Sequence, residues 1–138
     1  MNKNPEQEAI DLCIYWEKGF NERNIDICIE AMHFPHVRLW KNTYSIFYVA
    51  EDFIKGFSKQ TSDLEKEGWG KTITSNIKAI QSSEDKVHIT LHQSRRDKNN
   101  KEYHNFVTLW IVTKINDKWG IQFRSSFLEG ASQVNLLQ

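Results

Sequence analysis

The chain has 138 residues, of which 12% are aromatic, and its 18 basic and 18 acidic residues give a net charge of zero. This length fits a single domain with its own core, and the aromatic content argues against disorder. The balanced charge lacks the basic surplus of nucleic-acid-binding proteins, and no apolar run is long enough to cross a membrane. We therefore expect neither a nucleic-acid partner nor a membrane partner.

The number of cysteines and the composition of the N-terminus indicate which cofactors and which cellular compartment to expect. Cys13 and Cys28 are the only cysteines, too few for a thiolate zinc site, and both lie in helix-like patterns as small buried hydrophobes. The N-terminus lacks the apolar core of a signal peptide, and phosphate-binding glycine loops are absent. The sequence predicts a cytoplasmic protein without a metal or a cofactor.

Three helices are expected in the N-terminal half. The first begins after Asn4, which can cap it, with Pro5 at its first position and apolar residues at three- and four-residue spacing. The second covers 25 to about 32, and His33 is expected to cap its C-terminal end. The third covers roughly 51–67.

Strands account for most of the remaining residues. They are rich in β-branched and aromatic residues and are separated by short polar turns, which is typical of antiparallel pairing. The expected strands are 37–40, 44–49, 72–81, 86–96, 102–114 and 118–127. This order predicts an α+β fold with three helices packed on a mainly antiparallel sheet of about six strands. One domain, 1–138, is expected, with its core at about 6–127 and a loose tail at 128–138.

Several short motifs resemble one known superfamily. They are Tyr15-Trp16 with the turn at 20–24, Asp117-Lys118-Trp119-Gly120-Ile121 in the last hairpin, and the run from Phe34-Pro35-His36 through Gly68-Trp69 to Arg124-Ser125-Ser126-Phe127. They resemble the nuclear-transport-factor-2-like superfamily, which includes ketosteroid isomerase and the polyketide-cyclase-like proteins, and within it a bacterial branch of unassigned function. The resemblance covers 6–127. It implies a cone-shaped fold whose strongly curved sheet encloses a cavity, and dimerisation through the outer sheet face.

Alternation along the strands assigns their residues to the two faces of the sheet. If the turn that follows Arg95 is centred on Asn99, Arg95 lies opposite Tyr103 and Leu91 lies opposite Val107. Their shared face is apolar with a polar end. That end is either one end of a ligand cavity or the solvated end of a hairpin.

The opposite face of the same two strands carries His88, His92, Phe106 and Trp110. This mixture is too aromatic for a solvent-exposed face and too polar for a core, and aromatic enrichment is typical of interfaces. We expect a homodimer through this face. The alternative is a solvated sheet with incidental aromatic residues.

The last strand leaves the direction of Arg124 open. Alternation gives an apolar set from Trp119 to Phe127 that should face the core, which puts Arg124 on the dimer face. A bulge near Ser125-Ser126 would instead aim Arg124 into the cavity. The sequence does not decide between the two directions.

Candidate chemistry centres on His36. Ketosteroid-isomerase-like relatives use a strand carboxylate and a tyrosine, but the C-terminal strands here carry no Asp or Glu in their interiors, so this pair cannot be carried over. The resemblance implies that the strand with His36 lines the cavity, which makes His36 the best candidate general base. It shares one side of that strand with Arg38 and Trp40, so Arg38 could hold an anion. Alternatively, His36 is a structural residue that hydrogen-bonds the helix–strand turn.

The leading hypothesis is a protein that binds a mostly apolar organic ligand in an internal cavity. A cavity below about 100 Å³ would contradict it, since ligand sites usually measure several hundred. The alternatives are an isomerase-, dehydratase- or cyclase-type enzyme with His36 as base, and a dimeric protein-interaction module. The candidate ligand-binding residues are Trp16, Arg38, Trp40, Tyr48, Trp69, Arg95, Tyr103 and Arg124. Alternatively, the aromatic residues of this set are ordinary core residues that line no cavity.

Overall fold

The computed structural model of the protein describes residues 4–128, which form three helices and six strands. In chain order these are α1 (Pro5–Asn21), α2 (Ile25–Glu30), β1 (Met32–Trp40), β2 (Thr43–Phe47), α3 (Ala50–Lys66), β3 (Trp69–Ser82), β4 (Lys86–Asp97), β5 (Glu102–Ile115) and β6 (Lys118–Ser126). Every element expected from the sequence is present, although β1 begins earlier than expected.

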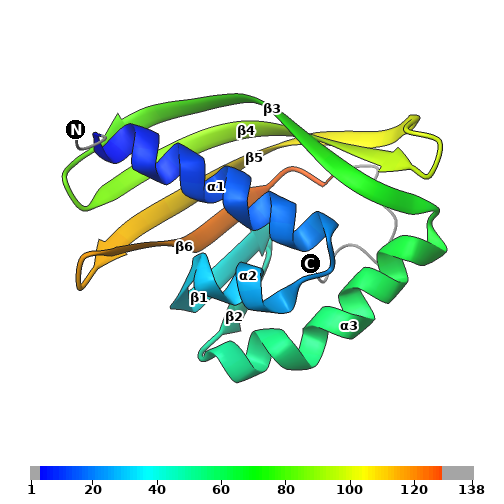
Figure 1. The fold of residues 1–138 in the computed structure, drawn as a ribbon, viewed down its shortest axis with the longest axis horizontal. Helices are drawn as coiled ribbons and strands as arrows, with labels where there is room; N and C mark the ends of the chain where they lie inside the picture. Colours follow the sequence, from blue (N-terminus) through cyan, green and yellow to red (C-terminus); the bar gives the residue numbers. More distant parts are fainter. Residues whose placement is uncertain (1–3, 129–138) are drawn as a thin grey trace.

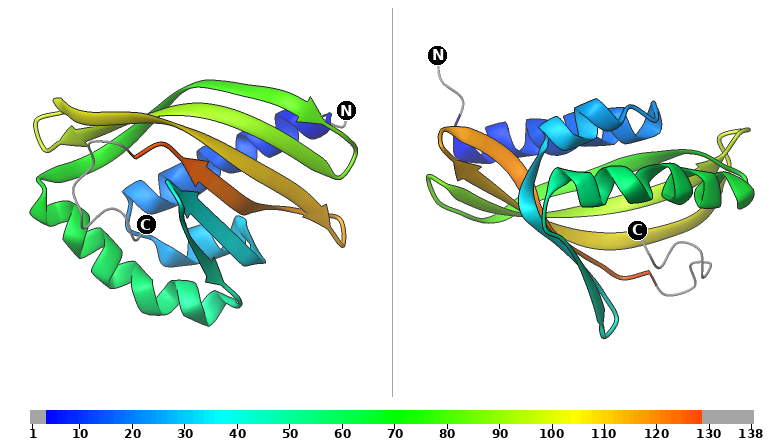
Figure 2. Two further views of the ribbon diagram at one scale, coloured as in Figure 1. Left: turned by 180° about the vertical axis from the view of Figure 1, so that it is seen from behind. Right: turned by 90° about the horizontal axis from the view of Figure 1, so that it is seen from below.

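The described strands form one sheet in the order β2-β1-β6-β5-β4-β3, with β1 and β6 parallel and the other neighbours antiparallel. Helix α1 lies across β3 to β6 in Figure 1, and it lies behind the sheet when the molecule is seen from behind (Figure 2). Helix α2 lies beside β1, and α3 reaches from β2 to β3. The fold is therefore the expected α+β arrangement of three helices on a curved, mainly antiparallel sheet.

The first two helices begin where their caps predict. The side chains of Asn4 and Asn24 accept hydrogen bonds from backbone amides of the first turn. Helix α2 ends at Glu30, however, and His33 lies in β1 with its ring Nε2 2.7 Å from the carbonyl oxygen of Lys118. The expectation that His33 caps this helix is wrong, because β1 begins early to pair with β6.

The core lies between α1 and the inner face of the sheet, the face that α1 covers. The Trp16 ring stacks on Phe20 with centroids 5.0 Å apart and meets Trp110 edge-on at 5.4 Å. Phe20 also contacts Trp69, with centroids 5.4 Å apart. Burial of such a side chain stabilises the fold by roughly 2 kcal/mol, so these rings fix α1 firmly on the sheet.

A bulge inverts the faces expected for β5. Arg96 pairs with Glu102, as expected from the centre of the turn, but the next pair is Arg95 with His104. Tyr103 is therefore an extra residue. A slip of one residue moves every later side chain of the strand to the other face.

Phe106 and Trp110 consequently lie on the inner face, with exposed fractions of 8% and 2%. Their assignment to the dimer surface is wrong. Val107, expected inside, is 52% exposed. His88 and His92 lie on the outer face with partial exposure, as expected.

A second bulge decides the direction of Arg124. The pairing with β5 shifts by one residue between Ile121 and Phe123, which leaves Gln122 as the extra residue. Ile121 and Arg124 are therefore both buried, and Arg124 lies inside. This bulge lies at Gln122, earlier in β6 than the position near Ser125-Ser126 that the sequence analysis considered. Phe127, expected inside, is exposed.

The described C-terminal end packs against the fold. Leu128 is buried in a small cluster with Trp40 and Phe106, so the expected loose tail does not begin at this residue. The rest of that tail lies outside the described residues. Within 4–128, no helix is both long enough and apolar enough to cross a membrane.

Candidate functional site: a buried arginine pocket

Three arginines from three strands line one small interior pocket. Arg38 on β1, Arg95 on β4 and Arg124 on β6 have exposed fractions of 4%, 2% and 5%. Arg38 and Arg124 are register partners on the paired strands β1 and β6. The pocket that they line has a volume of about 30 Å³. This is room for about one or two water molecules.

The pocket is apolar at its buried walls and polar at its mouth. The buried walls are aromatic rings from α1 and β5, which belong to Trp16, Phe20, Phe106 and Trp110. Half-buried polar residues from α1, α3 and β3 line the other end, and these are Glu17, Asn21, Gln60 and Thr72. The pocket therefore opens between α1, α3 and β3.

His36 is fully buried beside the pocket, and both of its ring nitrogens have partners. Its Nδ1 lies 2.9 Å from the carbonyl oxygen of Ile121, and its Nε2 lies 2.9 Å from Nε of Arg124. Burial, and then the charge of Arg124, hold the pKa of His36 well below its usual 6.5. The ring is therefore neutral at pH 7, and its lone pair faces a guanidinium group.

Arg38 is buried without a hydrogen-bonding partner among residues 4–128. Its Nε and Nη1 atoms are enclosed and unbonded, and its guanidinium carbon lies 5.6 Å from the centroid of the Trp40 ring. Burial, and then the charges of Arg124 and Arg95, hold its pKa well below its usual range. Guanidinium groups nevertheless stay protonated in proteins, so the pocket contains a desolvated positive charge.

Arg124 is held on two sides but keeps donors toward the pocket. Its Nε donates to His36, and its guanidinium carbon lies 4.8 Å from the centroid of the Trp16 ring. Its Nη2 is buried without a partner in the described part of the chain. Burial lowers the pKa of Arg124 to about 10. Arg95 stacks on Phe106 at 4.9 Å, and burial also lowers its pKa.

Acidic residues near the pocket have other partners. The Glu17 carboxylate at the mouth accepts a hydrogen bond from the Thr74 hydroxyl, and burial raises the pKa of Glu17. No carboxylate of the described residues forms an ion pair with Arg38 or Arg124. Residues 4–128 also contain no group of three or more His, Cys, Asp and Glu side chains that could hold a metal ion.

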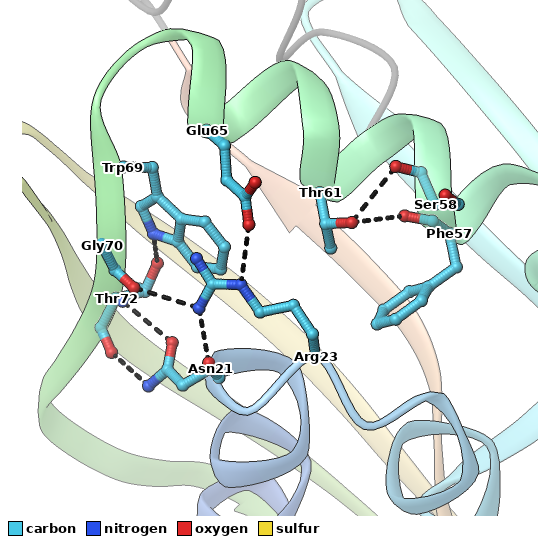
Figure 3. Close-up of polar contacts among 9 residues, drawn as sticks. All are labelled: Asn21, Arg23, Phe57, Ser58, Thr61, Glu65, Trp69, Gly70 and Thr72. Carbon is cyan, nitrogen blue, oxygen red and sulfur yellow. Dashed lines mark hydrogen bonds and ion pairs between the residues drawn. The ribbon is translucent and has the colours of Figure 1, made fainter.

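Figure 3 shows a polar cluster that includes Asn21 and Thr72, two residues of the mouth. The side-chain amide of Asn21 donates to the carbonyl of Thr72 and accepts from its backbone amide, both at 2.9 Å. The neighbouring Arg23 lies over the Trp69 ring, 4.0 Å from its centroid, and bonds to the backbone carbonyl of Gly70 at 3.0 Å. These contacts tie the end of α1 to the start of β3.

The structure brings together half of the ligand-binding residues expected from the sequence. Trp16, Arg38, Arg95 and Arg124 line the pocket, and His36 contacts one of them. The inward direction of Arg124 depends on the bulge in β6, and that of Phe106 and Trp110 depends on the bulge in β5.

The other four candidates lie outside the pocket. Trp40 belongs to a separate cluster, and Trp69 is a residue of the main core that lies beneath Arg23. Tyr48 is 67% exposed just before α3. The Tyr103 hydroxyl donates to Glu67 at 3.1 Å, because the bulge takes Tyr103 off the inner face.

Several residues that line the pocket were not expected from the sequence. Phe106 and Trp110 were assigned to the outer face, and only the correct register could have found them. Gln60, within α3, and Asn21, the last residue of α1, belong to no motif that indicates a ligand site. Arg38 is expected from the sequence because it shares one side of its strand with His36, whereas the direction of Arg124 is left open.

Comparisons with known proteins identify the fold. No protein-family model matches the chain, and no curated protein does. Solved structures resemble it over nearly their whole length. A protein of unknown function with a cystatin-like fold from Nostoc punctiforme has a TM-score of 0.75 at 14% identity, covering 97% of this chain and 99% of that one.

Two further solved structures have the same fold. An NTF-2 like protein of unknown function from Shewanella oneidensis has a TM-score of 0.71 at 16% identity, covering 89% of this chain and 98% of that one. A ketosteroid isomerase-like protein from Erwinia carotovora has a TM-score of 0.61 at 16% identity, covering 91% and 97%. Identities this low establish the fold and not the activity. The chain has the NTF2-like fold that its sequence motifs resemble.

Proposed function

We propose that the protein binds a small organic anion, whose carboxylate or similar oxyanion group is held by Arg38 and Arg124 with Arg95 beside them. The observation that carries the proposal is the burial of Arg38 and Arg124 without an ion pair to any carboxylate of residues 4–128, since the nearby Glu17 is hydrogen-bonded to Thr74. Taking one such charge out of water costs several kcal/mol, and an anion in the pocket would offset much of this. Guanidinium groups match carboxylates with two parallel hydrogen bonds.

The size of the pocket limits the ligand. Its volume of about 30 Å³ is below the limit of about 100 Å³ for a mostly apolar ligand, so the structure does not support that expectation. The space fits the head group of an acid. The rings of Trp16 and Phe20 would contact the first carbons of its body, which would extend toward the mouth. The proposed ligand is therefore a short organic acid.

The enzyme alternative receives less support. A general base needs a lone pair that a substrate proton can reach. In His36 that lone pair already accepts from Arg124, while Nδ1 is directed at a backbone carbonyl. Binding without proton transfer at His36 explains these contacts better. The cytoplasmic location expected from the sequence stays a prediction.

The proposal is tested by comparing acids with their neutral amides. Acetate and propionate, titrated as sodium salts, should raise the melting temperature and release or absorb heat, while acetamide and propionamide should not. Sodium chloride at the same ionic strength controls for general salt effects. Arg38→Gln should abolish the response, and Arg96→Gln, outside the pocket, should keep it. Equal responses to acid and amide, or an unchanged response in Arg38→Gln, would overturn the proposal.

We also propose that the protein forms a homodimer through the outer face of the sheet. Val107 and Phe127 on this side are 52% and 65% exposed, and they border a shallow groove with His92 and Leu109. Monomeric proteins rarely leave a large contiguous apolar patch exposed. Light scattering should give twice the chain mass, and Val107→Lys should give the single mass. A monomeric wild-type protein at micromolar concentration would contradict the dimer.

A further inference from the structure

We infer that His36 is a positioning residue, whose neutral imidazole holds the guanidinium of Arg124 so that its free edge points into the pocket. The inference rests on the proposed anion site. It gives His36 a role that differs from both roles expected from the sequence, namely a general base and a residue that bonds the helix–strand turn.

The hydrogen bonds of His36 determine which nitrogen carries the proton. The Ile121 carbonyl oxygen, 2.9 Å from Nδ1, can only accept, so Nδ1 must donate. The Nε of Arg124, 2.9 Å from Nε2, can only donate, so Nε2 must accept. Both contacts are satisfied by a single tautomer, with the proton on Nδ1. A cationic imidazole would place two N–H groups against each other.

This contact decides which edge of Arg124 is available. A guanidinium group can bind a carboxylate through its Nε edge or through its two terminal nitrogens. His36 occupies the Nε edge, which leaves Nη1 and Nη2 for a ligand. Nη2 is the atom that is buried without a partner. The Trp16 ring, 4.8 Å from the guanidinium carbon, fixes the plane of the group.

The fold delivers this arrangement through strand β1 and the bulge in β6. His36 and Arg38 are two residues apart, so alternation places both on the inner face of β1. One strand thereby supplies an anion-binding arginine and the residue that orients another. The bulge at Gln122 allows Ile121 and Arg124 both to face inward, and the Ile121 carbonyl fixes the imidazole. A histidine that only fills space in the core would need neither the bond to the Ile121 carbonyl nor the bond to Arg124.

The test separates orientation of Arg124 from general stability. His36→Gln keeps a side-chain oxygen that can accept from Arg124, whereas His36→Leu keeps the volume and has no acceptor. Loss of a hydrogen bond to a charged group weakens binding by about tenfold or more. We expect propionate affinity, measured by calorimetry at pH 7.5, to fall about tenfold in His36→Leu and to stay within about threefold of wild type in His36→Gln. Melting temperatures of both variants are measured in parallel.

Each outcome has a distinct meaning. If folded His36→Leu binds propionate as tightly as wild type, or if His36→Gln is as weak as His36→Leu, the positioning role is wrong while the anion site stands. If the wild-type protein binds no acid, the proposed function fails instead.

A second measurement does not depend on the variants or on binding. Nitrogen NMR of the wild-type imidazole at pH 7.5 should show a proton on Nδ1 and a bare Nε2, with a slowly exchanging Arg124 Nε–H. A protonated Nε2 would refute the inference even if His36→Leu does not fold.

Discussion

Arg23, beside the mouth, and Arg38, inside the pocket, differ in how their side-chain donors are used. Arg23, outside the pocket, bonds to Glu65 at 3.2 Å and to the carbonyls of Asn21 and Gly70 at 2.5 and 3.0 Å (Figure 3). Arg38, inside, bonds to no described residue although it is far more buried. The Nε and Nη1 donors of Arg23 reach protein acceptors, so this arginine stabilises the fold. The buried, unused donors of Arg38 are instead the basis of the proposed anion site.

The largest expected effect is the response of the pocket to acid. The pKa of His36 is held well below 6.5 in the folded protein and is about 6.5 when the chain is unfolded. As the pH falls below about 6.5, the unfolded chain binds the proton first, so stability decreases by up to about 1.4 kcal/mol per pH unit until the folded pKa is reached. Above about pH 7 the contribution is constant.

This prediction is checked by urea unfolding of the wild-type protein and His36→Gln at several values between pH 5 and 7.5. His104, whose pKa is also lowered by burial, contributes with the same sign in both proteins. The difference between the two slopes therefore isolates His36. Parallel slopes would mean that His36 is already charged, or is accessible to water.

The next effect concerns the arginines themselves. Replacing Arg38 with Met removes a desolvated charge that has no partner, so the free protein should become more stable by about 1–3 kcal/mol. The same variant should lose the stabilisation by propionate. Urea unfolding with and without propionate measures both changes. A clear loss of stability in the free protein would mean that Arg38 has a structural partner and that the contrast with Arg23 is false.

The sequence predicted the order of elements well because that information is local. The side chains of Asn4 and Asn24 define helix starts, and the turn before Glu102 is centred as expected. Local signals of this kind depend on a few neighbouring residues, so one sequence is enough to find them.

The site was harder to predict because it depends on two bulges. Tyr103 and Gln122 are extra residues in β5 and β6, and neither has a sequence feature that marks it as one. Each shifts the alternation by one residue, which reverses the inward and outward faces. The sequence therefore places Phe106 on the outer face and leaves the direction of Arg124 open. Arg38 lies on β1, whose inward-facing residues the sequence analysis identifies correctly.

The smallest expected effect is at Arg23. Its replacement by Met should lower stability by about 1–2 kcal/mol, because two backbone carbonyls lose a charged donor and the Trp69 ring loses its stacked group. The exposed pair with Glu65 should add little, since such pairs are worth less than about 1 kcal/mol. Arg23→Lys keeps the charge without the planar fork and should recover only part of the loss. Acid binding should be retained in both variants, because Arg23 does not line the pocket. If Arg23→Met instead abolished binding of propionate while remaining folded, the mouth and the arginine pocket would have to be treated as one site, and the distinction between structural and ligand-binding arginines would not hold.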